Sequence, residues 1–134
     1  MEISRLPFRL GGLYGGCAKL DGLIIVSPEN LTLEYRMTDN LIGAWGGPIV
    51  TRSFVWRDLE RAECGLGFFS PWLALTARSL STFDQLPCTD PCRLKLGIAW
   101  KHRRQLRTVS SEINLHLSYQ EADRLRRRLP EPVE

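Results

Sequence analysis

The sequence predicts a mainly β domain of the α+β class: six or seven short antiparallel strands form a barrel or sandwich, capped by one C-terminal amphipathic helix over residues 119–129. Short segments rich in branched aliphatic and aromatic residues recur and are separated by Gly, Pro and Asn, which is typical of strands and turns. A helix-start pattern, Ser-x-x-Glu at 118–121, follows the last of these segments. The 134 residues are enough for one domain with its own core.

Seven segments predict strands: 20–26, 31–35, 49–56, 61–64, 72–77, 94–100 and 111–117. In 31–35 and 94–100 every second residue is large and apolar, which indicates one buried and one exposed face. The Gly-rich stretch 10–16 lacks the Gly-Lys-Ser/Thr end of a phosphate-binding loop, so we expect turns there.

Residues 106–117 fit two patterns. Leu106, Val109, Ile113 and Leu117 have the spacings of three and four that a helix needs, whereas Ile113, Leu115 and Leu117 alternate as in a strand. We favour the strand over 111–117 because Val-Ser-Ser at 109–111 is a poor helix centre.

The C-terminal helix has one apolar face, formed by Tyr119, Ala122, Leu125 and Leu129, and we expect this face to dock on the sheet because so short a helix is unstable alone. Arginines near its end favour the helix dipole, and Pro130 ends it. The expected core comprises Leu31, Leu33, Tyr35, Phe54, Trp56, Leu73, Leu75, Leu94, Leu96, Ile98, Trp100, Leu115, Leu125 and Leu129.

We expect one domain over 1–134, with a Gly-rich N-terminal segment (1–18), strands over 19–117, the helix over 118–129 and a tail over 130–134. The longest aliphatic run, 23–26, is far too short to span a membrane, and no signal peptide is visible at the start. A cytoplasmic location with reduced cysteines is therefore expected.

Charge is unevenly distributed. Residues 93–128 hold ten basic and three acidic side chains, a net of +7, and the rest of the chain has a net of −4. Lys101, Arg103, Arg104 and Arg107 are candidate anion-binding residues, together with the arginines of 124–128. Nucleic acid is disfavoured because Trp100 is the only aromatic residue near them that could stack on a base.

No catalytic or metal motif is present. Cys88 and Cys92 have a spacing that zinc ligands use, but a structural site needs four ligands, and no second pair is spaced to complete it. A disulfide bond between Cys88 and Cys92 is an alternative that the sequence does not decide. Neither His102 nor His116 has a nucleophile placed beside it by a known motif. We therefore expect no catalytic residues, no metal and no cofactor, and a protein that is not an enzyme.

The layout resembles the bacterial pleckstrin-homology-like (GRAM-like) barrel over roughly residues 19–129. Residues 31–35 (Leu-Thr-Leu-Glu-Tyr) are similar to the second strand of that family, 54–59 to a strand end with an acidic corner, and 112–118 to the last strand that leads into the closing helix. The resemblance implies two antiparallel sheets packed nearly orthogonally, with the helix at one open end. Lipid-binding members carry Lys and Arg in the first hairpin loop, whereas 27–30 (Ser-Pro-Glu-Asn) is acidic here.

The family includes binders of lipids, peptides and proteins, so the fold alone does not select a function. We expect a non-catalytic binding module for a protein or peptide, with Trp45, Phe68 and Phe69 in Gly-rich loops as its contact residues. Self-association through an uncovered strand edge is a related hypothesis. The alternative function is binding of anionic lipid or phosphate at a basic surface formed by 101–107 and 124–128.

Overall fold

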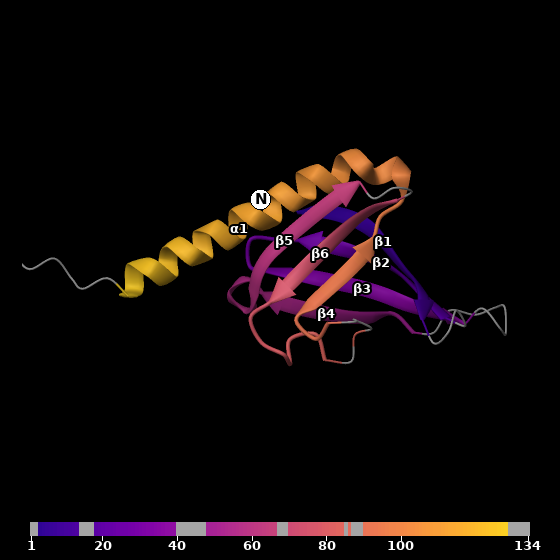
Figure 1. Cartoon of the computed structure of the whole chain (residues 1–134), viewed down its shortest axis with the longest axis horizontal. Helices are drawn as coiled ribbons and strands as arrows, with labels where there is room; N and C mark the ends of the chain where they lie inside the picture. The colour runs from indigo at the N-terminus through magenta and orange to yellow at the C-terminus, as the bar shows by residue number, and fades with distance from the viewer. Residues whose placement is uncertain are drawn as a thin grey trace, which may run out of the picture.

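The computed structural model describes residues 3–13, 18–39, 48–66, 70–84, 86 and 90–128. The prediction of a mainly β, α+β fold with an antiparallel sheet and one C-terminal helix is confirmed (Figure 1). The elements are β1 (Ser4–Leu13), β2 (Ala18–Val26), β3 (Asn30–Asp39), β4 (Val50–Val55), the 3-10 turn η2 (Trp56–Asp58), β5 (Leu59–Leu66), β6 (Pro71–Ala77), β7 (Arg93–Gly97), the 3-10 turn η3 (Trp100–His102) and α1 (Arg103–Arg128).

The seven strands form one antiparallel sheet in the order β4-β3-β2-β1-β7-β6-β5. The end strands β4 and β5 are not neighbours in this order, so the sheet is not closed. Its two halves, β1–β4 and β5–β7, meet where Arg9 of β1 pairs with Gly97 of β7. In Figure 1 the strands of the second half cross the direction of the first, so both halves can contribute to one core between them.

Strand β1 was not expected, because the N-terminal segment reads as Gly-rich. It pairs with β2 from Ser4, opposite Val26, to Leu10, opposite Leu20. The signal that identifies it is the alternation of Leu6 and Phe8, both buried, with exposed neighbours. Phe8 lies opposite Gly22, and a Cβ on Gly22 would approach the Phe8 ring to 2.6 Å. A glycine is therefore required under this ring.

The core contains most of the side chains expected there. Those confirmed as buried are Leu31, Leu33, Phe54, Trp56, Leu73, Leu75, Leu94, Leu96 and Ile98. Tyr35 is half-buried and packs against this cluster. Strand β6 is buried on both faces over Leu73, Ala74 and Leu75, which places it at the centre of the second half of the sheet.

The predicted strand over 111–117 and the predicted helix start at 118 are wrong. One helix, α1, runs from Arg103 to Arg128, so Ser118 lies in mid-helix and caps nothing. The poor helix propensity of Ser110 and its neighbours amounts to only tenths of a kcal/mol per residue. Burying an aliphatic side chain contributes about 1.5–3 kcal/mol. Four such side chains with helical spacing are buried, and they outweigh local propensity: Leu106, Val109, Ile113 and Leu117.

The apolar face that was expected to dock on the sheet points away from it. Tyr119 is 64% exposed, and Leu115 and Leu125 are each 51% exposed, so placing them in or on the core was wrong. Leu129 lies outside the described residues. The inner face of α1 packs through its N-terminal half, mainly against β5. Its C-terminal half extends past the strands (Figure 1).

The side of the molecule opposite α1 is covered by the connection between β6 and β7 (Figure 1). Phe83 of this connection is 1% exposed, and its ring meets that of Phe54 edge to face with centroids 5.4 Å apart. Arg52 of β4 donates hydrogen bonds to the carbonyl oxygens of Asp84, at 2.6 Å, and Thr82, at 3.0 Å. The core is therefore covered at both ends, by α1 and by this connection.

Candidate functional site

The three aromatic residues expected to contact a partner, Trp45, Phe68 and Phe69, lie outside the described residues. The part of the chain that is described offers three other surfaces: a hollow beside η3, the outer side of α1, and a cleft under the C-terminal end of α1. All three contain residues that the sequence singles out, since Arg124, Arg127 and Arg128 of the cleft belong to the basic segment 124–128.

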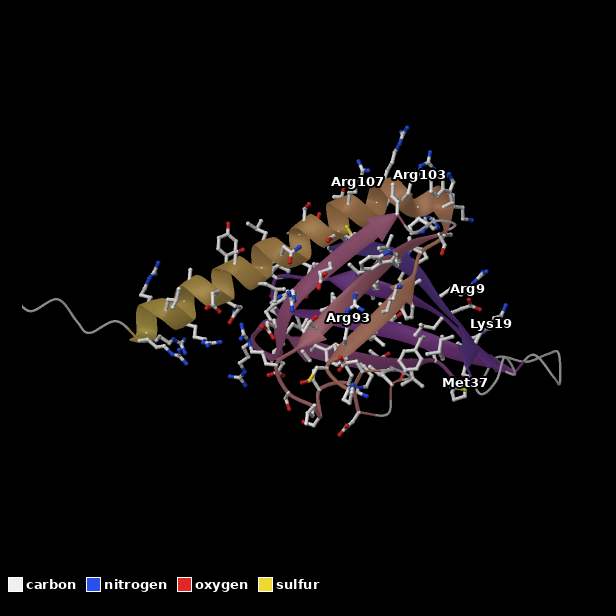
Figure 2. All side chains as sticks on the ribbon, viewed as in Figure 1. Arg9, Lys19, Met37, Arg93, Arg103 and Arg107 are labelled. Atoms are coloured by element: carbon white, nitrogen blue, oxygen red, sulfur yellow. The ribbon has the colours of Figure 1, made fainter. Side chains whose placement is uncertain are left out.

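The predicted anion-binding residues lie at the N-terminal end of α1. Lys101 is in η3, and Arg103, Arg104 and Arg107 are in the first turns of the helix. Figure 2 shows Arg103 and Arg107 projecting away from the strands. Arg103 is engaged locally, because its Nη1 donates to the Trp100 carbonyl at 3.0 Å and its guanidinium lies 4.8 Å from the Trp100 ring. The other three are exposed and form no ion pair within the described residues.

Trp100 is 55% exposed, which overturns its assignment to the core. Strand β7 ends at Gly97, and the extended conformation of Ala99 leads the chain into η3 before Trp100 could return to the sheet. The Trp100 side chain instead borders a hollow of about 560 Å³ that also contacts Lys101 and His102.

The hollow beside η3 carries charges of both signs. Arg9 Nε and Asp21 Oδ1 form an ion pair of 2.9 Å on its wall. His102 Nδ1 is 2.7 Å from Gln105 Oε1, so this ring nitrogen already has a partner. The hollow thus holds one ion pair, a histidine nitrogen that already has a partner, and the ammonium of Lys101, which is unpaired among the described residues.

The two basic segments, 101–107 and 124–128, do not form one compact surface. They lie at opposite ends of a single helix, and from Arg104 to Arg126 that helix rises by roughly 33 Å. A small anion therefore cannot contact both segments. A large partner that lies along the helix can.

The outer face of α1, defined by Arg104, Arg107, Leu115, Tyr119 and Leu125, lies opposite the buried face of the helix. Three large apolar side chains occupy its middle and C-terminal parts, two arginines occupy its N-terminal part, and none of the five residues is acidic. Tyr and Arg are enriched where proteins bind one another. The helix thus has two apolar faces, of which the sheet uses one.

The cysteines and histidines that the structure describes show no clustering. In the described residues no group of three or more His, Cys, Asp or Glu side chains is placed to hold a metal ion. Cys64 is an exposed free thiol and Cys92 a half-buried one, whereas Cys17 and Cys88 lie outside the description. The His116 ring stacks on Trp56 with centroids 4.7 Å apart and planes 11° from parallel, which gives it a packing role.

Comparisons with protein-family models, with curated proteins and with solved structures found no match to this chain. Within the described residues, no helix is both long enough and apolar enough to cross a membrane. The exposed surfaces of this molecule are therefore the guide to its function.

Proposed function

We propose that the chain is a non-catalytic module that binds a protein or peptide partner through the outer face of α1. The observation that carries this proposal is the exposure of Leu115, Tyr119 and Leu125 on the side of the helix that the domain does not cover. A soluble helix normally has one apolar stripe, which faces the core. A second exposed stripe with an aromatic anchor is typical of a docking surface.

The charges on this face indicate what kind of partner fits. Arg104 and Arg107 lie at one end of the stripe and Arg126 at the other, on the same side of the helix. A second copy of α1 would bring arginine against arginine in either orientation, which is unfavourable. The face instead suits an apolar segment flanked by acidic residues, so we favour a different protein over self-association.

The resemblance to pleckstrin-homology-like barrels supports a binding role. Seven antiparallel strands and one following helix are compatible with the capped barrel that the resemblance implies, although the strands form one open sheet and not two separate sheets. Domains of this layout present rims and helices on a rigid scaffold, and such surfaces commonly bind. The acidic turn at 27–30, expected to be the first hairpin loop, joins β2 to β3 and is the second, because β1 precedes it, so its charge does not bear on lipid binding at the first loop.

Site-directed photo-crosslinking in native cells tests this proposal. Tyr119 is replaced by p-benzoylphenylalanine, and Thr51, an exposed residue of β4, serves as the control position. We expect a protein adduct of defined mass from position 119 and none from position 51. The double variant Leu115→Ser/Leu125→Ser, with the crosslinker at 119, should lose the adduct. Equal labelling at 51 and 119, or an adduct that persists in the double variant, contradicts the proposal.

Binding of an anionic lipid surface is the second candidate. The observation that favours it is the exposure of Arg104 and Arg107 beside an apolar stripe, since basic amphipathic helices bind acidic membranes. Flotation with phosphatidylcholine vesicles, with and without phosphatidylserine, distinguishes the two candidates. Salt-sensitive flotation that needs phosphatidylserine and is lost in Arg104→Gln/Arg107→Gln supports the lipid function. If no such flotation is observed, the lipid function is excluded and binding of a protein partner is favoured.

A further inference from the structure

A cleft under the C-terminal half of α1 is lined by arginines from three elements. It has a volume of about 460 Å³, and η2, the end of β6 and α1 border it. Its five arginines, which define the arginine cleft, are Arg57, Arg78, Arg124, Arg127 and Arg128. The acidic residues of the lining are Asp58 and Asp123, so the lining has a formal net charge of +3.

The acidic side chains nearby do not satisfy these arginines. Glu121 Oε2 is shared, at 3.2 Å from Arg78 Nη2 and 3.8 Å from Arg124 Nη1. Asp123 Oδ2 is 3.3 Å from Arg127 Nη2. Two carboxylates therefore form ion pairs with three guanidinium groups. The other two arginines form no ion pair within the described residues.

One guanidinium nitrogen has an unused donor. Arg124 Nε is buried and has no hydrogen-bond partner in the described part of the chain. Buried donors in proteins are almost always paired, so an unpaired one calls for an explanation. Arginine cannot lose its proton at physiological pH to relieve the repulsion among these groups. An anion in the cleft would reduce this repulsion and would accept hydrogen bonds from the exposed guanidinium groups of Arg57 and Arg128.

We propose that the arginine cleft binds a compact, multiply charged phosphate ligand. The planar fork of guanidinium donors matches phosphate oxygens, and several arginines around one group are the usual way in which proteins hold it. Arg57 and Arg78 come from the body of the domain, and Arg124 and Arg128 from the extended part of α1. A bound phosphate group therefore bridges the two and fixes the C-terminal half of the helix against η2.

Pyrophosphate is the probe for a test by calorimetry and thermal unfolding. Arg57→Gln/Arg128→Gln removes two exposed arginines without ion pairs, so the variant should fold, which circular dichroism verifies. Arg5→Gln/Arg36→Gln is the matched control, because it removes the same charge from two exposed arginines of β1 and β3 that line no part of the cleft and form no ion pair within the described residues. We expect pyrophosphate to raise the Tm of the natural chain and of the control. The Arg57/Arg128 variant should bind at least about tenfold more weakly.

Equal weakening in both variants would mean that only net charge matters, and would overturn the proposal, as would the absence of any calorimetric or thermal response in the natural chain. Hydrogen exchange gives an independent readout: pyrophosphate should slow exchange of the backbone amides of 120–128 and leave those of 104–108 unchanged. Uniform slowing, or none, also contradicts the proposal.

The phosphate group bound by the arginine cleft can belong either to a soluble phosphate compound or to a lipid headgroup. Vesicles of phosphatidylcholine with phosphatidic acid distinguish them. Flotation that is lost in Arg57→Gln/Arg128→Gln but kept in the control assigns the cleft to a headgroup. Pyrophosphate binding without flotation assigns it to a soluble ligand. Neither outcome depends on the protein adduct at Tyr119, so this proposal and the proposed function can fail separately.

Discussion

The side chain of Asn114 makes two hydrogen bonds with the main chain of Ala62. The Ala62 N–H donates to Asn114 Oδ1 at 3.3 Å, and Asn114 Nδ2 donates to the Ala62 carbonyl at 3.1 Å. Ala62 is in β5, an end strand whose outer edge has no neighbouring strand among the described residues. A helix amide therefore supplies, at one position, the donor and acceptor that a further strand would provide.

Replacing Asn114 should weaken the attachment of α1 to β5. Asn114→Ala leaves the Ala62 N–H and carbonyl without these partners, and we expect unfolding to become easier by about 1–3 kcal/mol. Ser118→Ala, at an exposed position one turn later, should change stability by less than about 0.5 kcal/mol. Urea unfolding of both variants measures the difference. Equal stability of the two would show that these bonds contribute nothing.

The two faces of α1 predict opposite outcomes for two nearby residues. Ile113 is fully buried, so Ile113→Ala should destabilise by about 2–5 kcal/mol. Leu115, which is 51% exposed, should tolerate Leu115→Ala within about 0.5 kcal/mol. Guanidinium unfolding followed by circular dichroism compares them. A large loss at Leu115 would mean that its face is packed, and would remove the support for the docking surface.

The connection between β6 and β7 should contribute strongly to stability through one side chain. The Phe83 side chain is 1% exposed, so Phe83→Ala leaves a cavity in the core and removes the edge contact with Phe54. We expect the free energy of unfolding to fall by about 3–5 kcal/mol. Leu80, in the same connection, is 69% exposed and is the matched control. Differential scanning calorimetry should show a much lower Tm for Phe83→Ala only. Similar Tm values would contradict the role of this connection as a cover of the core.

The junction between the halves of the sheet depends on a glycine. A Cβ on Gly97 would lie 2.8 Å from the Arg9 carbonyl oxygen, so Gly97→Ala must push β1 away from β7. Such overpacking destabilises by about 1–3 kcal/mol. Lys95→Ala, at an exposed site of the same strand, is the control. Hydrogen exchange should accelerate at the amides around Arg9 in the Gly97 variant alone, and unchanged exchange would show that the strands accommodate the methyl group.

Period-two patterning predicted the strands at 31–35 and 94–100, where one face is buried. Most other predicted strands were identified by branched aliphatic and aromatic content between turn residues, a criterion that also covers β6, buried on both faces. Period-two patterning failed at 111–117, where Ile113, Leu115 and Leu117 fit both periods. The decision there depends on which residues meet the sheet: Ile113 and Leu117 are buried and Leu115 is exposed. Tertiary packing determines whether 111–117 is a helix or a strand, and the local sequence alone does not.

The candidate site was predicted only in part. Lys101 and Arg104 were identified by charge, and both are exposed as expected. Tyr119 and Leu125 were identified as an apolar face and placed on the wrong side of the molecule. The available clue was that a helix extended back to 106 has two apolar stripes on opposite sides. The arginine cleft was predicted in part: the arginines of 124–128 were identified by charge, but Arg57 and Arg78 are brought to Arg124 only by the fold.

The pairing of Arg9 with Gly97 is the one ladder contact between β1 and β7 in the described residues. Cohesion between the halves therefore comes chiefly from apolar side chains, whose attraction has no preferred direction and weakens on cooling. A complete ladder of hydrogen bonds between β1 and β7 would fix the register of the two strands at every temperature. We therefore expect chilling to loosen the seam between β1 and β7 before it loosens either half.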